Sequence, residues 1–169
     1  MSRVSIVIQG NDIQRGMLEL EKKIESRVSL PQKILFAATG TLEKTLSLLT
    51  DSETEVQVLE QKDLGNVINR SVRIVQKKRG CALVTAKSRI YPNYLPYAVV
   101  RKIRKKQSSI GEILDSEKVE TCKSLQTIGY DPSHRTFFRT YQIICKQNIA
   151  FNIEEIFLKS LFDQIKIDV

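Results

Sequence analysis

The sequence is poor in the residues that build metal centres and disulfide frameworks. It has one histidine, and its three cysteines, Cys81, Cys122 and Cys145, lie far apart with no CxxC pair. This pattern predicts neither a zinc site nor a disulfide framework, and it is typical of a reducing compartment. No apolar run approaches the roughly 20 residues of a transmembrane helix, and the N-terminus lacks the apolar block of a signal peptide. We therefore expect a soluble protein with no membrane span.

Glycine and proline are also scarce, and this favours a folded chain. Seven glycines and four prolines, with no low-complexity tract and no internal repeat, argue against disorder. The 169 residues, of which 41% are hydrophobic, are enough for one domain with its own core, covering residues 1–169.

Acidic residues are outnumbered by basic ones, which gives a formal net charge of +8 and a pI near 9.5. Such a surface attracts anions, whether nucleic acid, acidic lipid or a small carboxylated metabolite, and charge alone does not distinguish these partners. The basic runs at 77–79 and 101–106 are interpreted as a solvated hairpin turn and a solvated helix end.

Hydrophobic periodicity predicts a mixture of helices and strands. The 3.6-residue period favours helices at about 12–26, 31–38, 41–49, 97–105 and 109–114, with a last helical turn near 157–162. Alternation favours strands at about 4–9, 54–62, 67–76, 81–91 and 119–128, and two more between 137 and 158 joined at Lys146-Gln147-Asn148. Gly129-Tyr130-Asp131-Pro132 is predicted to be a turn. The expected fold class is α+β, a single antiparallel sheet with flanking helices.

Two charged residues are predicted on the apolar faces of strands. Glu155 shares a strand face with Phe151, Ile153 and Phe157, and Arg70 shares one with Ile68, Val72 and Ile74. A charge in such a place must be neutralised, paired or facing a cavity that receives a ligand. The small residues Ala82, Ala86 and Ser88 on the next strand would leave room for that ligand.

A structural ion pair is the competing interpretation of these charges. If the last hairpin has a three-residue loop, Arg139 faces Glu155 across the ladder, and Tyr141 faces Ile153. A β-bulge between Arg70 and Arg73 would exchange the faces of these two arginines.

Several segments, in order, resemble the chorismate lyase family, the enzymes that release pyruvate from chorismate to leave 4-hydroxybenzoate. The resemblance runs from about Ile34 to Leu158 and is carried by Leu35-Phe36-Ala37-Ala38-Thr39-Gly40-Thr41-Leu42, Asn69-Arg70-Ser71-Val72, Thr85-Ala86-Lys87-Ser88-Arg89-Ile90, Leu95-Pro96, Ser109-Ile110-Gly111-Glu112-Ile113-Leu114, Arg139-Thr140-Tyr141 and Ile153-Glu154-Glu155-Ile156-Phe157. It is similar to the branch found in archaea, cyanobacteria and red-algal plastids. The resemblance therefore implies a plastid stroma or a cyanobacterial-type cytoplasm.

The resemblance also implies a site. It implies a small carbon–oxygen lyase for quinone biosynthesis, without metal or cofactor, whose helical flaps close over an internal ligand pocket. Arg70 would grip a carboxylate of the dicarboxylate substrate, and Glu155 would be the essential acid. Backbone N–H groups near Leu42 and at Ile110 and Gly111 would also hold the ligand.

Two positions depart from the family pattern: Thr39 replaces an aspartate, and Cys122-Lys123 replaces an arginine-rich stretch. These changes leave room for a member that binds a small aromatic carboxylate without turnover. A basic RNA-binding protein is a third interpretation, although we expect no nucleic acid partner. The oligomeric state is not predicted by the sequence.

Overall fold

The structure is a computed structural model that describes residues 4–7, 12–106 and 108–165. Its helices are α1 (Ile13–Ile24), α2 (Leu30–Ala37), α3 (Leu42–Thr50), α4 (Tyr97–Arg104), α5 (Ile110–Ser116) and α6 (Lys159–Phe162), with a 3-10 turn η1 (Pro92–Tyr94). Its strands are β1 (Val4–Val7), β2 (Thr54–Asp63), β3 (Ile68–Gln76), β4 (Cys81–Ile90), β5 (Cys122–Asp131), β6 (Thr136–Cys145) and β7 (Asn148–Phe157). Residues 8 and 9 of the first predicted strand lie outside the described residues.

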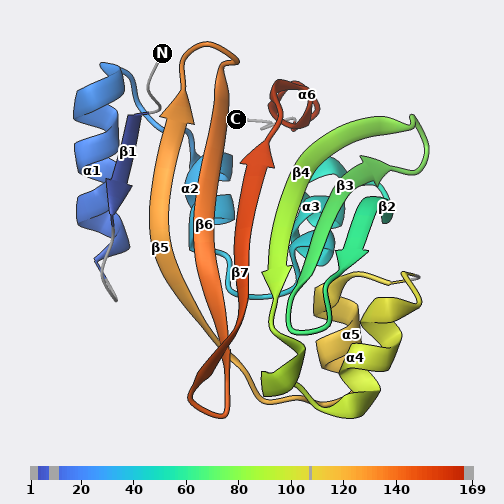
Figure 1. The fold of residues 1–169 in the computed structure, drawn as a ribbon. Helices are drawn as coiled ribbons and strands as arrows, with labels where there is room; N and C mark the ends of the chain where they lie inside the picture. Colours follow the sequence, from blue (N-terminus) through green and yellow to red (C-terminus); the bar gives the residue numbers. More distant parts are fainter. Residues whose placement is uncertain (1–3, 8–11, 107, 166–169) are drawn as a thin grey trace.

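The described strands form one antiparallel sheet in the order β1-β5-β6-β7-β4-β3-β2 (Figure 1). The expected α+β class with a single antiparallel sheet is therefore confirmed. No helix in the described part of the chain is both long and apolar enough to cross a membrane.

The hairpin between β6 and β7 differs in detail from the prediction. Its loop has two residues, Lys146 and Gln147, whose φ angles of 45° and 66° are those of a tight hairpin turn. An irregularity between Ile143 and Ile144 then shifts the register by one residue. The three-residue loop was therefore wrong, but the shift restores the register that it implied, and Arg139 pairs with Glu155.

The turn predicted at 129–132 was also wrong. Gly129, Tyr130 and Asp131 continue β5 and pair with Phe138, Phe137 and Thr136. The chain reverses later, where Arg135 adopts a φ of 52° and the Asp131 carboxylate accepts a hydrogen bond from the backbone N–H of Ser133. The cross-strand contact of Tyr130 with Phe137, at 4.9 Å between ring centroids, favours strand over turn here.

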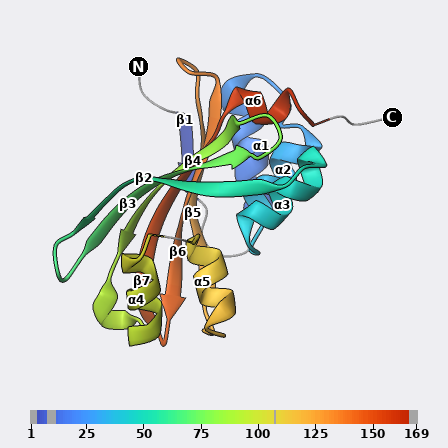
Figure 2. The same cartoon turned by 90° about the vertical axis from the view of Figure 1, so that its right-hand side faces the viewer.

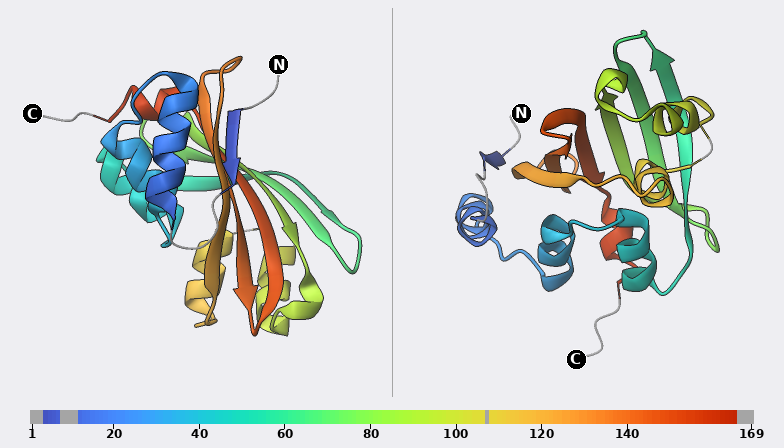
Figure 3. Two further views of the ribbon diagram at one scale, coloured as in Figure 1. Left: turned by 90° about the vertical axis from the view of Figure 1, so that its left-hand side faces the viewer. Right: turned by 90° about the horizontal axis from the view of Figure 1, so that it is seen from below.

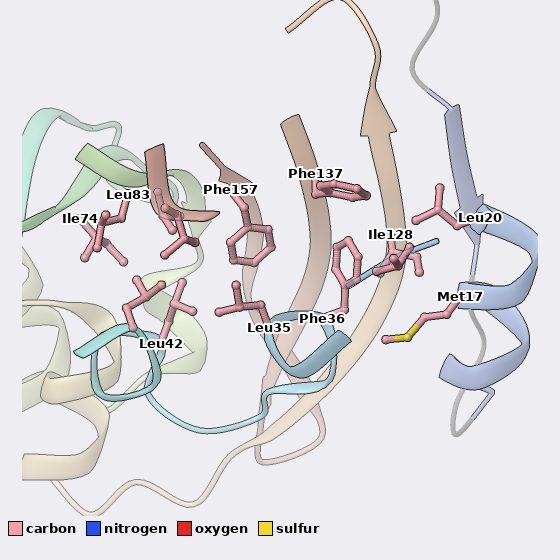
Figure 4. Close-up of a cluster of buried hydrophobic side chains, with 14 residues drawn as sticks. Met17, Leu20, Leu35, Phe36, Leu42, Ile74, Leu83, Ile128, Phe137 and Phe157 are labelled. Carbon is pink, nitrogen blue, oxygen red and sulfur yellow. The ribbon is translucent and has the colours of Figure 1, made fainter. Parts of the chain in front are cut away.

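Two groups of helices pack at opposite ends of the same sheet face (Figures 2 and 3). The first core unites α1, α2 and α3 with one end of the strands; Figure 4 shows Leu35 and Phe36 of α2 beneath Phe157 and Phe137. The second core unites α4 and α5 with the other end, through residues such as Ile103, Ile113 and Phe151. The middle of this sheet face lies between the two cores.

Candidate functional site

A cavity of about 540 Å³ lies over the middle of this sheet face. Ala86 and Ser88 of β4 contribute small side chains to its lining, and the starts of α3 and α5 line it as well. All five predicted site residues are on this lining: Arg70, Glu155, Leu42, Ile110 and Gly111. The volume is in the ordinary range for sites that enclose a small molecule.

Arg70 is the arginine that points into the cavity. It is 3% exposed, whereas Arg73 is exposed and donates to Gln57 at 2.7 Å. The register irregularity in the β3–β4 pairing lies between Ile74 and Val75, beyond both arginines, so their faces are not exchanged.

Two of the three nitrogen donors of the Arg70 guanidinium make no hydrogen bond to the described residues. Nη2 donates to the Ser108 carbonyl at 2.6 Å, while the buried Nε and Nη1 have no hydrogen-bond partner among the described residues. Burial lowers the pKa of Arg70, and the negative charge of Glu43 opposes this effect. Nε–H and Nη1–H lie on different edges of the planar guanidinium, so a two-point contact with one carboxylate needs one of them together with the second N–H of Nη2.

Glu155 is held by two neighbours on β6. Arg139 Nε donates to its Oε2 at 2.6 Å, and the Tyr141 hydroxyl donates to its Oε1 at 2.7 Å. Both members of the ion pair are buried. Burial first, and the nearby Glu155 charge second, raise the pKa of Tyr141 well above its ordinary value, so this hydroxyl stays a donor.

Arg139 also stabilises the C-terminal end of α2. Its Nη1 donates to the carbonyls of Leu35, Phe36 and Ala38, at 2.6, 3.2 and 2.8 Å. These are among the carbonyls that the end of α2 leaves without helical partners. The ion pair with Glu155 therefore also anchors the segment that leads from α2 to α3.

Arg70 and Glu155 do not pair with each other. Arg70 is opposite Ser88, and Glu155 is opposite Ala86 two residues further along β4. The strands β3 and β7 are two strand spacings apart, or about 10 Å. The small side chains of Ser88 and Ala86 lie between the two charges, so the cavity keeps them apart.

The starts of α3 and α5 face each other across the cavity mouth. A Cβ atom at Gly111 would lie 3.0 Å from Thr41 Cγ2, so any larger residue there requires the Thr41 side chain to shift by a few tenths of an ångström. Thr41 is the N-cap of α3 but makes no side-chain cap; its hydroxyl donates to Asp115 of α5 at 3.0 Å. The first N–H groups of α3, beginning at Leu42, are therefore not capped by the Thr41 side chain.

The start of α5 is capped differently. Ser109 and Glu112 form a reciprocal capping box, in which the Glu112 N–H donates to Ser109 Oγ at 3.1 Å. This cap uses the third N–H of the helix and leaves those of Ile110 and Gly111 outside it.

Two half-buried charged residues of the lining, Lys123 and Glu43, were not among the predicted site residues. Lys123 of β5 donates to the Gly40 carbonyl at 2.7 Å and lies 5.4 Å from the Tyr141 ring centroid. Burial lowers its pKa. Lys123 shares the inward side of β5 with Leu125, but a strict period of two counted from the buried Ile128 puts it on the other face; the irregularity between Leu125 and Thr127 brings it inward.

The other missed residue is Glu43, in the first turn of α3. Burial raises the pKa of its carboxyl above the ordinary 4.5, against an opposing hydrogen bond with Ser109. A helical signal existed, since Glu43 precedes the buried Leu46 and Thr50 by three and seven residues and so shares their face.

Of the positions that depart from the family pattern, Lys123 is the half-buried lining residue described above, and the other two are exposed. Thr39 is on the lining and exposed, and Cys122 is exposed and not on the lining. Among the described residues, no group of three or more His, Cys, Asp or Glu side chains is arranged to hold a metal ion.

The chain is similar in sequence to chorismate pyruvate-lyases of mycobacteria. It is 27% identical over 157 residues to the Mycobacterium leprae (strain TN) enzyme, covering 77% of this chain and 75% of the relative. The Mycobacterium tuberculosis (strain ATCC 25618 / H37Rv) enzyme is 26% identical over 160 residues, covering 77% and 80%. No protein-family model matches the chain.

The fold is similar to that in the crystal structure of PhnF from Mycobacterium smegmatis. The TM-score is 0.52 at 8% sequence identity, and the match covers 98% of this chain and 91% of that one. At this identity the likeness concerns the fold alone.

Proposed function

We propose that the protein is a chorismate lyase-like enzyme that eliminates pyruvate from chorismate and leaves 4-hydroxybenzoate. The observation that carries the proposal is a cavity lined by a buried arginine with two free donors and by a fixed carboxylate, on strands that lie about 10 Å apart in the sheet. The relatives named chorismate pyruvate-lyase support a carbon–oxygen lyase.

The proposed reaction breaks one C–O bond of chorismate. The enolpyruvyl group leaves with the electrons of that bond, the ring loses a proton and becomes aromatic, and the departing group gains a proton to become pyruvate. Atoms and electrons balance without water or a redox partner. Catalysis then consists mainly of positioning and of electrostatic stabilisation of the departing group.

Arg70 would hold the ring carboxylate. Its free Nε or Nη1, together with the second N–H of Nη2, supplies the two donors that a bidentate contact requires, and the other N–H of Nη2 stays on Ser108. The uncapped N–H groups at Leu42 would contribute at the cavity mouth, and those of Ile110 and Gly111 would do so as the family resemblance implies.

Glu155 would handle or orient the transferred proton. Arg139 and Tyr141 hold one carboxylate oxygen each, so the group is locked in orientation, and each oxygen retains a lone pair. A fixed carboxylate on the cavity lining is suited to accept a proton from a substrate held against Arg70.

One observation favours a second candidate, a non-catalytic binding domain for a small aromatic carboxylate. Both oxygens of Glu155 are engaged by protein donors, as in an ion pair whose task is to anchor α2. In that case Arg70 alone would define the ligand, and the protein would bind 4-hydroxybenzoate without turnover.

Turnover of chorismate separates the two candidates. We expect purified protein to release 4-hydroxybenzoate, followed by absorbance, and expect Glu155→Gln and Arg70→Met to lose at least about 100-fold in kcat/KM. The matched controls are Glu154→Gln and Arg73→Met, neighbours on the opposite strand faces, and these should retain activity. Tight binding of 4-hydroxybenzoate by wild type without any product from chorismate would refute the enzyme and support the binding domain.

We also propose a plastid stroma or a cyanobacterial-type cytoplasm as the location. The support is the resemblance of the sequence to that branch of the family. Fractionation of the source cells with an antibody against the protein would test it.

A further inference from the structure

The charges on the cavity lining do not cancel. Glu155 is paired with Arg139, and Asp115 is paired with Lys44. Arg70 and Lys123 form no ion pair with any described residue, and the remaining acid, Glu43, has a raised pKa. The lining together with Arg139 therefore has four cations and three acids, an excess of one positive charge that favours an anionic ligand.

Arg70 and Lys123 stand at opposite sides of the cavity. Arg70 is on β3, and Lys123 is on β5, four strands further along the sheet. The row that begins at Arg70 runs through Ser88, Ile153 and Tyr141, so a small residue, an aliphatic one and an aromatic ring lie between the cations. An apolar ring can rest on this row while each end meets a positive charge.

Arg70 and Lys123 differ in their exposure to solvent and in the segments that they contact. Arg70 is 3% exposed and lies against Ser108 next to the capped start of α5. Lys123 is half-buried and contacts Gly40, an exposed residue of the segment between α2 and α3. Arg70 therefore marks the enclosed side of the cavity, and Lys123 marks the side nearer to solvent.

We propose that Lys123 forms a second anion subsite, which receives the carboxylate that departs with pyruvate, while Arg70 receives the carboxylate that remains on the ring. This inference rests on the proposed function, because it assigns the two carboxylates of the same substrate. The Lys123 ammonium has three donors and uses one of them for Gly40, so two remain for the ligand. Its place at the more open side suits a group that leaves first.

Lys123 has a competing structural role, since its bond to Gly40 also holds the segment between α2 and α3. The two roles differ in what they do to ligands. A subsite for the second carboxylate affects dicarboxylates only, whereas a loosened segment weakens every ligand of the cavity by a similar factor.

The test compares two stable ligands by calorimetry. The monocarboxylate is 4-hydroxybenzoate, and the dicarboxylate is 3-(carboxymethoxy)-4-hydroxybenzoate, which carries a second carboxylate on an ether side chain. For Lys123→Met we expect the dicarboxylate Kd to rise at least about 30-fold and the 4-hydroxybenzoate Kd to change less than about threefold. Lys123→Arg should retain most of the dicarboxylate affinity. Lys87→Met, on the opposite face of the sheet, removes the same charge and should change neither Kd.

Equal weakening of both ligands, or no change in either, would overturn the subsite. Turnover of chorismate by wild type is measured in parallel. If Lys123→Met selectively weakens the dicarboxylate but wild type makes no product from chorismate, the lyase is refuted and the anion subsite is supported. A wild type that turns over chorismate while Lys123→Met binds both ligands normally would refute the subsite alone.

Discussion

Two buried arginines on the same sheet face should respond in opposite ways to the same substitution. Arg70 and Arg139 are 3% and 2% exposed. Arg139 is paired with Glu155 and donates to three carbonyls, and only its Nη2 is without a described partner. Arg70 makes one hydrogen bond and leaves Nε and Nη1 without a described partner. We predict that Arg70→Met stabilises the ligand-free protein and that Arg139→Met destabilises it.

The magnitudes follow from these contacts. The two Arg70 donors without a partner cost about 2–6 kcal/mol together, and the bond from Arg70 to Ser108 contributes about 1.5–3 kcal/mol. The central values leave Arg70→Met a net gain of about 2 kcal/mol in the free energy of unfolding. Loss of Arg139 leaves Glu155 buried without its cation, which costs about 3–5 kcal/mol. For a chain of this length, each kcal/mol shifts Tm by about 2–4 °C.

Urea unfolding without ligand measures both effects, with the exposed Arg73→Met as the control, expected within about 0.5 kcal/mol of wild type. Addition of 4-hydroxybenzoate should stabilise wild type and Arg73→Met but not Arg70→Met. If Arg70→Met lowers the free energy of unfolding by more than about 1 kcal/mol at an unchanged m-value, Arg70 holds the fold together and the ligand argument fails.

Three further predictions concern the neighbours of these residues. Gly111→Ala should weaken 4-hydroxybenzoate binding about tenfold, since the new Cβ meets Thr41 Cγ2 at 3.0 Å, and Thr41→Ser in the same chain should restore binding because it removes that methyl group. Because the pKa of Glu43 is raised in the folded state, its contribution to the free energy of unfolding is fully present below 4.5 and is lost as pH rises through the folded-state pKa. As pH rises from 4.5 through the folded-state pKa of Glu43, the free energy of unfolding of Glu43→Gln should therefore increase relative to that of wild type. Urea unfolding at a series of pH values measures this difference. Tyr141→Phe should lower the free energy of unfolding by about 1–3 kcal/mol, because it removes the hydroxyl that donates to Glu155.

Each of these three predictions would be refuted by a specific result. Failure of Thr41→Ser to rescue Gly111→Ala would mean that the two helix starts are not spaced by this contact. A Glu43→Gln curve parallel to wild type at every pH would refute the raised pKa. A neutral Tyr141→Phe would mean that the hydroxyl does not stabilise Glu155.

Local patterns in the sequence were sufficient for the faces of the central strands. Side chains alternate at a period of two, so Arg70 and Glu155 were predicted on inward faces, and the burial of both side chains confirms this. On β5 the rule alone is insufficient, because Lys123 and the buried Ile128 face the same side only across the irregularity between Leu125 and Thr127. Helix starts were similarly local, and the capping box at Ser109 was predicted from four consecutive residues.

What the local patterns could not decide is how the strands and helices lie against each other. A single register shift beside a two-residue turn determines that Arg139 meets Glu155, and such a shift leaves little trace in composition. The cavity exists because two hydrophobic cores pack at the two ends of one sheet face, and the approach of Gly111 to Thr41 depends on the packing of α3 against α5. The sequence by itself determined which side chains face inward, because that property repeats along each strand. Only the tertiary structure decided which of them are paired and which are left for a ligand, because pairing depends on distances between segments far apart in the chain.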